Sequence, residues 1–328
     1  MFTIKKIAAR AALAGATALF GLSSQAAIPI QHWTLANGAK VYFAPVESLP
    51  IVDVQLDFDA GSRRDPAGQA GLASVSANMV EKGVRAVGDQ PALDQNALGE
   101  AWADLGAEFN VGASGERTTF SLRTLSDAPL LNKAVALASR EIGEPSFPDD
   151  VWQRDRERIK AAIKESNTRP GTVAGRAFAQ AVYGTHPYGQ ETTEATLMRI
   201  GVDTMRQRYG ELIVPCRAKL SIVGQVTRAQ ADAIATALLA RLPQTAPDAA
   251  ACAPLPPVAP VVALSAPKEE RIAFDAAQAQ VLIGQPGYLR RDPDHFALTL
   301  GNYILGGGGF VSRLTNEVRE KRGLAYSV

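Results

Sequence analysis

The chain has 328 residues, of which 46% are hydrophobic and 20% are charged, so it can bury more than one hydrophobic core. Its formal net charge is +1, and without the three cations of residues 1–26 it is about −2. This balance gives no electrostatic reason to expect a nucleic acid as a partner.

Residues 1–26 have the pattern of a secretory signal peptide. Lys5, Lys6 and Arg10 precede an apolar run at 11–22, and Ser-Gln-Ala at 24–26 supplies the small residues that signal peptidase prefers. The run is short for a membrane span, although a retained membrane anchor stays open as an alternative. We therefore expect export to the periplasm. No later stretch has the roughly 18 uninterrupted apolar residues of a spanning helix, so we expect no membrane contact after the leader is removed.

Residues 27–243 are predicted to form one α+β domain. Asn37 and Gly38 predict a β-hairpin, and the alternation of apolar and polar residues over 51–60 predicts a half-buried strand. Further strands are expected at 107–111, 118–123 and 218–223, and helices at 71–82, 92–105, 129–142, 148–165, 174–183 and 227–242. Strands followed by helices, partly in hairpins, favour a mixed or antiparallel sheet packed by helices.

A linker and a second domain are predicted after this region. Residues 244–268 are rich in Ala and Pro, which is typical of an extended, fairly stiff linker. The second domain is expected over 269–328, with a strand at 277–284 and a helix at 294–305. A small independent domain of about 60 residues stays open, although it would be marginal without disulfides or metals.

The two cysteines leave two alternatives open. Cys216 and Cys252 could form a disulfide that ties the linker to the first domain, or both could be unpaired. Their spacing does not fit a zinc knuckle.

The stretch 306–326 carries the most specific pattern in the chain. The run Gly306, Gly307, Gly308 and Gly309 lets another backbone approach closely. An amphipathic helix is expected from residue 310, with a glycine at 323 as its C-terminal cap. Arg319 ends this helix and Tyr326 follows where a strand could start, so the guanidinium and the phenol could point to one place. Equally, they could be an ordinary cationic helix end and a packed tyrosine.

This stretch resembles the glycine-rich loop and helix in the second domain of the pitrilysin/insulinase family of zinc metallopeptidases, which includes the mitochondrial processing peptidase. The resemblance extends more weakly over the rest of the chain after residue 26. It implies two homologous peptidase-like α/β sandwich domains of similar size, so we expect that the sequence is truncated within the second one. It also implies that Arg319 and Tyr326 contact substrate across the chamber that holds the active site.

The same resemblance implies that the zinc site of the family is degenerate here. The family's H-x-x-E-H motif binds zinc through its two His, and its Glu is the general base. Ser74 and Asn78 stand at the two His positions, Ala77 at the Glu position and Ala162 at the position of the third ligand. The three histidines of the chain share no helix face, so we expect no metal site from His32, His186 and His295.

The chain is therefore expected to be the non-catalytic subunit of a heterodimeric periplasmic zinc metallopeptidase. It would hold no cofactor itself, whereas an active partner of the same family would carry the zinc. The alternatives are a structural or assembly subunit and a peptide-binding module, neither of which has a role in catalysis.

Overall fold

The computed structural model describes residues 28–243 and 252–328. The predicted signal peptide and the start of the predicted linker, residues 244–251, lie outside the described residues. No helix in the described ranges is both long enough and apolar enough to cross a membrane.

A six-stranded mixed sheet forms the centre of the first domain. Its strands lie in the order β1-β2-β8-β3-β7-β6, and only β2 and β8 are parallel. The strands are β1 (Gln31–Thr34), β2 (Lys40–Pro45), β3 (Ile51–Phe58), β6 (Glu108–Ala113), β7 (Thr118–Leu125) and β8 (Lys219–Gly224). A separate two-stranded sheet pairs β4 (Gly83–Val84) with β5 (Leu93–Asp94). The predicted α+β architecture with a mixed sheet is confirmed.

The strand β3 shows why one face of the sheet is buried. Val52, Val54, Leu56 and Phe58 are at most 3% exposed and face the helices, as the alternation predicts. The opposite face is polar, and the Asp53–Arg123 ion pair joins β3 to β7 there at 2.6 Å.

The predicted hairpin between β1 and β2 is confirmed, although its loop has more than two residues. The strands pair up to Thr34 and Lys40, which leaves residues 35–39 in the loop. Gly38 adopts a φ of 89°, which favours glycine, and the side chain of Asn37 accepts the backbone N–H of Ala39 at 3.1 Å.

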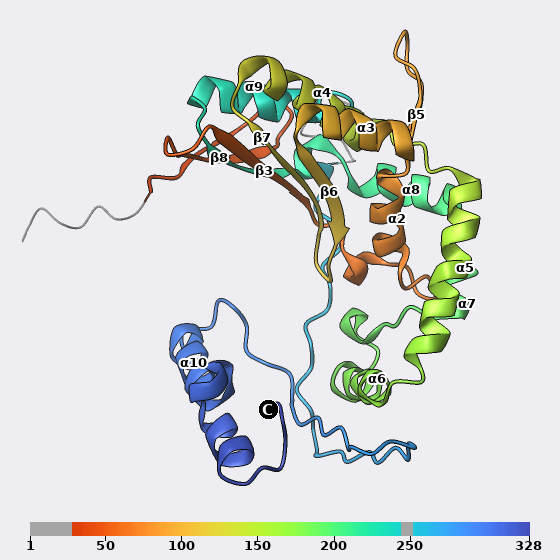
Figure 1. The fold of residues 1–328 in the computed structure, drawn as a ribbon, viewed down its shortest axis with the longest axis vertical. Helices are drawn as coiled ribbons and strands as arrows, with labels where there is room; N and C mark the ends of the chain where they lie inside the picture. Colours follow the sequence, from red (N-terminus) through yellow and green to blue (C-terminus); the bar gives the residue numbers. More distant parts are fainter. Residues whose placement is uncertain (1–27, 244–251) are drawn as a thin grey trace, which may run out of the picture.

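Helices cover the buried face, with α4 and α9 packed against each other and against the sheet (Figure 1). The six predicted helices are confirmed as α2 (Leu72–Val80), α3 (Gln95–Leu105), α4 (Ala128–Gly143), α5 (Asp149–Ser166), α6 (Pro170–Tyr183) and α9 (Arg228–Leu239). Two further helices, α7 (Glu194–Leu197) and α8 (Val202–Leu212), were not predicted. Thr227 and Gln230 form a reciprocal capping box at the start of α9.

The region after the linker contains helical turns but no strand among its described residues. They are α10 (His295–Asn302), the π-helical turns Tyr303–Gly307 and Thr315–Glu320, and the 3₁₀ turn Gly309–Val311. The predicted strand at 277–284 is wrong, as is the strand expected to start at Tyr326. A strand needs a neighbour for its backbone hydrogen bonds, and no described segment pairs with either one. The domain boundaries at 243 and 269 stay a prediction.

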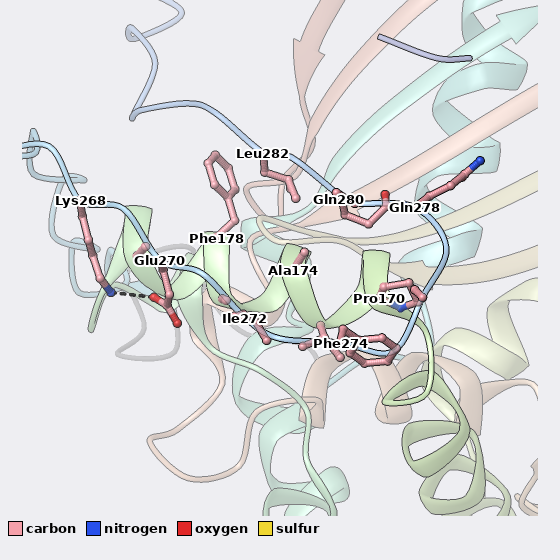
Figure 2. Close-up of a pocket in the computed structure, with 15 residues that line it drawn as sticks. Pro170, Ala174, Phe178, Lys268, Glu270, Ile272, Phe274, Gln278, Gln280 and Leu282 are labelled. Atoms are coloured by element: carbon pink, nitrogen blue, oxygen red, sulfur yellow. Dashed lines mark ion pairs between the residues drawn. The ribbon is translucent and has the colours of Figure 1, made fainter. Parts of the chain in front are cut away.

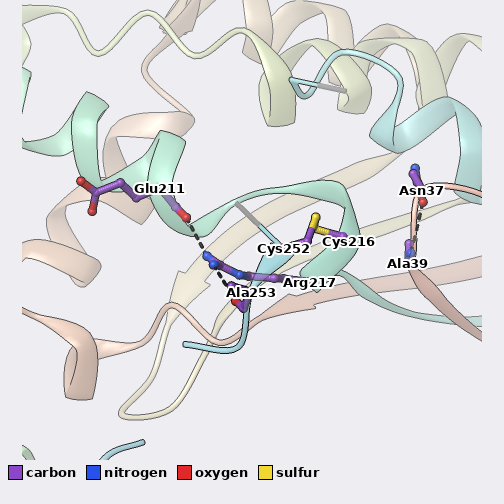
Figure 3. The surroundings of a disulfide bond; sticks show 7 residues. All are labelled: Asn37, Ala39, Glu211, Cys216, Arg217, Cys252 and Ala253. Carbon is purple, nitrogen blue, oxygen red and sulfur yellow. Dashed lines mark hydrogen bonds between the residues drawn. A yellow bond between two sulfur atoms is a disulfide. The ribbon is translucent and has the colours of Figure 1, made fainter. Parts of the chain in front are cut away.

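Cys216 and Cys252 form a disulfide, with their Cα atoms 5.7 Å apart (Figure 3). It fixes the start of the described linker to the turn before β8. Farther along, the backbone carbonyls of Ala253 and Ala259 bond to Arg217 and His186, at 3.1 and 2.8 Å. The linker therefore follows the surface of the first domain.

Candidate functional site

The helix α2, which carries three of the four positions predicted for the degenerate zinc site, begins at a turn that requires glycine. Gly71 caps it at a φ of 102°, and a Cβ atom there would lie 2.7 Å from Thr192 Oγ1. The carboxylate of Asp65 accepts the N–H groups of Gly71 and Ala73, both at 2.9 Å. Burial raises the pKa of Asp65 to about 6.

The side chains at the zinc positions do not fit a zinc ion. Ser74 and Asn78 lie one turn apart on the exposed face of α2, while Ala77 is 3% exposed and points inward. Ala162 is exposed on α5. A hydroxyl, an amide and two methyl groups provide none of the imidazole or carboxylate ligands that zinc prefers. Within residues 28–243 and 252–328, no three His, Cys, Asp or Glu side chains gather as a metal site.

Each of the three histidines contacts neighbouring rings or backbone groups rather than another histidine. His186 accepts the N–H of Tyr188 at 3.1 Å and contacts the linker through its other nitrogen. His32 stacks on Tyr42, and His295 packs edge-on against Phe296. The three therefore lie in separate parts of the described chain.

Arg319 and Tyr326 lie together. The guanidinium carbon of Arg319 is 4.8 Å from the ring centre of Tyr326 and 4.8 Å from that of Phe310. The Tyr326 side chain is 84% exposed, so its phenol is not packed in a core. Phe310 was not predicted as a contact of Arg319, because residue 310 was expected at the start of an amphipathic helix. The role of the pair toward substrate stays a prediction.

The chain reversal that brings the pair together depends on two caps. Ser312 Oγ accepts the N–H of Thr315 at 3.2 Å, and the helix starts after Ser312, three residues later than predicted. Gly323 adopts a φ of 61° and donates its N–H to the Arg319 carbonyl at 2.9 Å, so the predicted C-terminal cap is confirmed. The left-handed turn at Gly323 sends the chain back over Arg319.

In the glycine run, two positions have a structural requirement for glycine. Gly308 donates its N–H to the Tyr303 carbonyl at 2.8 Å, and a Cβ atom on Gly308 would lie 3.0 Å from that oxygen. Gly309 adopts a φ of 60°. The backbone that approaches Gly308 here belongs to this chain, and the predicted approach of a peptide to Gly306 and Gly307 stays a prediction.

A hollow of about 340 Å³ that was not predicted lies between α6 and the extended segment 268–282 (Figure 2). Phe178, Ile272 and Phe274 give it apolar walls, and an ion pair between Lys268 and Glu270 closes one end at 3.0 Å. The residues that line it include no histidine and no cysteine.

Two family models cover most of the chain. Residues 44–196 match "Insulinase (Peptidase family M16)", and residues 199–328 match "Peptidase M16 inactive domain". The chain aligns with the crystal structure of a peptidase M16 inactive domain from Pseudomonas fluorescens at 30% sequence identity and a TM-score of 0.77. The alignment covers 91% of this chain and 69% of that protein. The chain belongs to peptidase family M16.

Curated relatives within the M16 family include proteins named as proteases and a protein named as a non-peptidase. An "Uncharacterized zinc protease" of Streptomyces coelicolor is 26% identical over 91% of the chain. The "Non-peptidase homolog YmxG" of Helicobacter pylori is 24% identical over 89% of the chain. The chain spans 63% and 65% of the lengths of these two relatives. The inactive-domain match and the likeness to the non-peptidase homologue support a non-catalytic M16 member.

Proposed function

We propose that this chain is the non-catalytic subunit of a heterodimeric, periplasmic M16 peptidase. The proposal rests on one combined observation: the predicted substrate-binding pair is present, while the predicted zinc positions hold no zinc ligands. Arg319 lies against the exposed ring of Tyr326, whereas the zinc positions hold Ser74, Ala77, Asn78 and Ala162. A substrate-binding pair without a hydrolytic centre fits a subunit whose partner supplies that centre.

The division of labour follows from the chemistry of the two side chains. Zinc bound by the H-x-x-E-H motif of the active partner would supply the activated water. The phenol hydroxyl of Tyr326 donates a hydrogen bond to the oxyanion that develops on the scissile carbonyl. The guanidinium of Arg319 donates to a backbone carbonyl of the peptide and holds it in register.

The packing of Arg319 supports this role. Its side chain is 29% exposed because the rings of Phe310 and Tyr326 both lie against it. A cation held by aromatic faces has fewer side-chain conformations to lose when it binds a peptide. Because Arg319 Nε lies 3.4 Å from Glu320 Oε1, the two terminal amino groups are the donors that are partly preorganised for a carbonyl.

Two features support the cellular setting. The predicted leader implies export, and the Cys216–Cys252 disulfide fits an oxidising compartment such as the periplasm. Within the glycine run, the Tyr303 carbonyl already lies against Gly308, so an extended peptide backbone would approach Gly306, Gly307 or Gly309.

Co-expression with the active partner tests the proposal. The partner to use is an M16 protein with an intact H-x-x-E-H motif encoded next to this chain. We expect the two to co-purify and to cleave peptides in a chelator-sensitive way, while this chain alone neither retains stoichiometric zinc nor cleaves. Zinc retention and cleavage by this chain alone would overturn the proposal.

A second candidate is a structural or peptide-binding subunit that takes no part in turnover. The name of the Helicobacter pylori relative, a non-peptidase homologue, favours it. The same complex separates the two candidates, because a purely structural subunit would tolerate loss of the Tyr326 hydroxyl without any change in turnover.

A further inference from the structure

The polar face of the sheet carries an unusual pair of like charges. Lys40 on β2 and Lys219 on β8 are direct partners across the parallel strands, and both are exposed. Like charges directly opposite each other on neighbouring strands destabilise a sheet. Among the described residues, neither lysine has a carboxylate within ion-pair distance.

Arg217, two residues before Lys219, adds a third cation to the same place. Its guanidinium donates to the backbone carbonyls of Glu211 at 2.7 Å and Ala253 at 3.1 Å (Figure 3). No described carboxylate forms an ion pair with it. Burial, and then repulsion from Arg64, lower the pKa of Arg217, although the nearby Asp59 raises it.

Two adjoining hollows open around these cations. One has a volume of about 250 Å³ and lies beneath the disulfide, while the other has a volume of about 170 Å³ and lies toward the β6–β7 turn. They share Asp59, Arg217 and Lys219. The charged side chains that line them are six cations and three carboxylates: Lys40, Arg63, Arg64, Arg117, Arg217, Lys219, Asp57, Asp59 and Glu116.

Each of the three carboxylates already forms an ion pair with an arginine that lines the hollows. Asp59 pairs with Arg63 at 3.0 Å and with Arg64 at 2.7 Å. Asp57 faces Lys219 across the β3–β8 pair but pairs with Arg117 at 3.2 Å. Glu116 pairs with Arg63 at 3.3 Å. The three cations of the adjoining hollows that form no ion pair among the described residues are therefore Lys40, Arg217 and Lys219.

We propose that the hollow around Lys40, Arg217 and Lys219 is a carboxylate-binding subsite for an acidic side chain of an extended peptide. The choice of a peptide rests on the proposed function, whereas the choice of a carboxylate rests on the uncompensated cations. A bound carboxylate relieves the repulsion between the two lysines and accepts hydrogen bonds from their ammonium groups. The subsite would make this subunit select peptides with Asp or Glu.

Titration calorimetry on this chain alone tests the subsite without the active partner. The probes are the peptides acetyl-GGEGEGG-amide and acetyl-GGQGQGG-amide, with inorganic phosphate as a third probe. We expect the Glu peptide to bind roughly tenfold more tightly than the Gln peptide, since each exposed ion pair contributes up to about fivefold. The K40Q/K219Q double variant should bring the two peptides within about twofold of each other.

The matched control is Lys133→Gln, which removes an exposed lysine of α4 that does not line the hollow. It should keep the preference for the Glu peptide. The thermal midpoint of K40Q/K219Q should not fall, because the variant removes a like-charge pair rather than a stabilising contact. A lower midpoint would assign the lysines a structural role and overturn the subsite.

Two binding results would also overturn the proposal. One is an unchanged preference for the Glu peptide in K40Q/K219Q. The other is variant-sensitive binding of phosphate with no discrimination between the two peptides, which would make the hollow a site for inorganic anions. Because no turnover is measured, loss of the subsite leaves the proposed role of Tyr326 untouched.

Discussion

The guanidinium of Arg319 lies 4.8 Å from the ring centre of Tyr326, seven positions later in the chain. The left-handed turn at Gly323 makes this contact, because the chain reverses there instead of continuing the helix. The phenol ring therefore covers the cation while its hydroxyl stays accessible to a substrate. A substitution by phenylalanine can therefore remove the hydroxyl and keep the ring on Arg319.

Tyr326→Phe should reduce turnover of the reconstituted heterodimer by roughly 10²–10³-fold, which is the usual cost of losing one oxyanion donor. The phenylalanine ring still packs on Arg319, so assembly with the active partner should persist. Steady-state cleavage and size-exclusion chromatography measure the two properties. Tyr303→Phe is the matched control, since Tyr303 belongs to the same region and is 56% exposed.

Much of the first domain could be predicted from local patterns. The period of two in β3 depends on residues close in sequence, and the strand it predicts is confirmed. The capping box of Thr227 and Gln230 at the start of α9 is local in the same way. The helix α8 was missed because only Val202, Met205 and Leu212 of its residues are buried. The charged residues between them interrupt the apolar period that would predict a helix.

The site was predictable only in part. The spacing of Arg319 and Tyr326 indicated that they could meet, but the contact with Phe310 depends on how the chain turns at Ser312. The Cys216–Cys252 pairing could not be derived, because it depends on where the linker runs. The degenerate zinc positions came from the family resemblance, since a serine, an asparagine and two alanines have no pattern of their own.

Restoring the zinc ligands tests the positions assigned to them. The triple variant S74H/N78H/A162E should bind one zinc per chain, because it recreates two His at i and i+4 and a carboxylate third ligand. Metal analysis after gel filtration measures the stoichiometry. The matched control replaces Ala162→Glu by Ala161→Glu, which puts the carboxylate on the neighbouring exposed position of α5. Equal zinc binding by both triple variants would show that Ala162 is not the third-ligand position.

Removing the disulfide should destabilise the attachment of the linker to the first domain. The bond closes a sequence separation of 36 residues, and a loop of this size contributes about 2–4 kcal/mol through the unfolded state. Cys216→Ala combined with Cys252→Ala should lower the free energy of unfolding by that amount in a denaturant titration. Reductant should have the same effect on the parent chain and none on the double variant. A parent chain that is insensitive to reductant would contradict the prediction.

The buried carboxyl of Glu141 should make the stability of the first domain depend on pH. Glu141 is 2% exposed and accepts the indole N–H of Trp102. Burial raises its pKa from 4.5 to about 7, and the nearby Glu81 also raises it. The folded state then binds more protons than the unfolded state between these values, so this group lowers stability as the pH rises from about 4.5 to 7.

Glu141→Gln should remove this dependence, because the amide is neutral at every pH and its oxygen can still accept from Trp102. At pH 8 the variant should be more stable than the parent by about 1–3 kcal/mol, while at pH 4.5 the two should be nearly equal. Thermal melts between these limits measure the difference, with Glu108→Gln on the exposed edge of β6 as the control. A stability difference that does not change with pH would show that Glu141 is not protonated preferentially in the folded state.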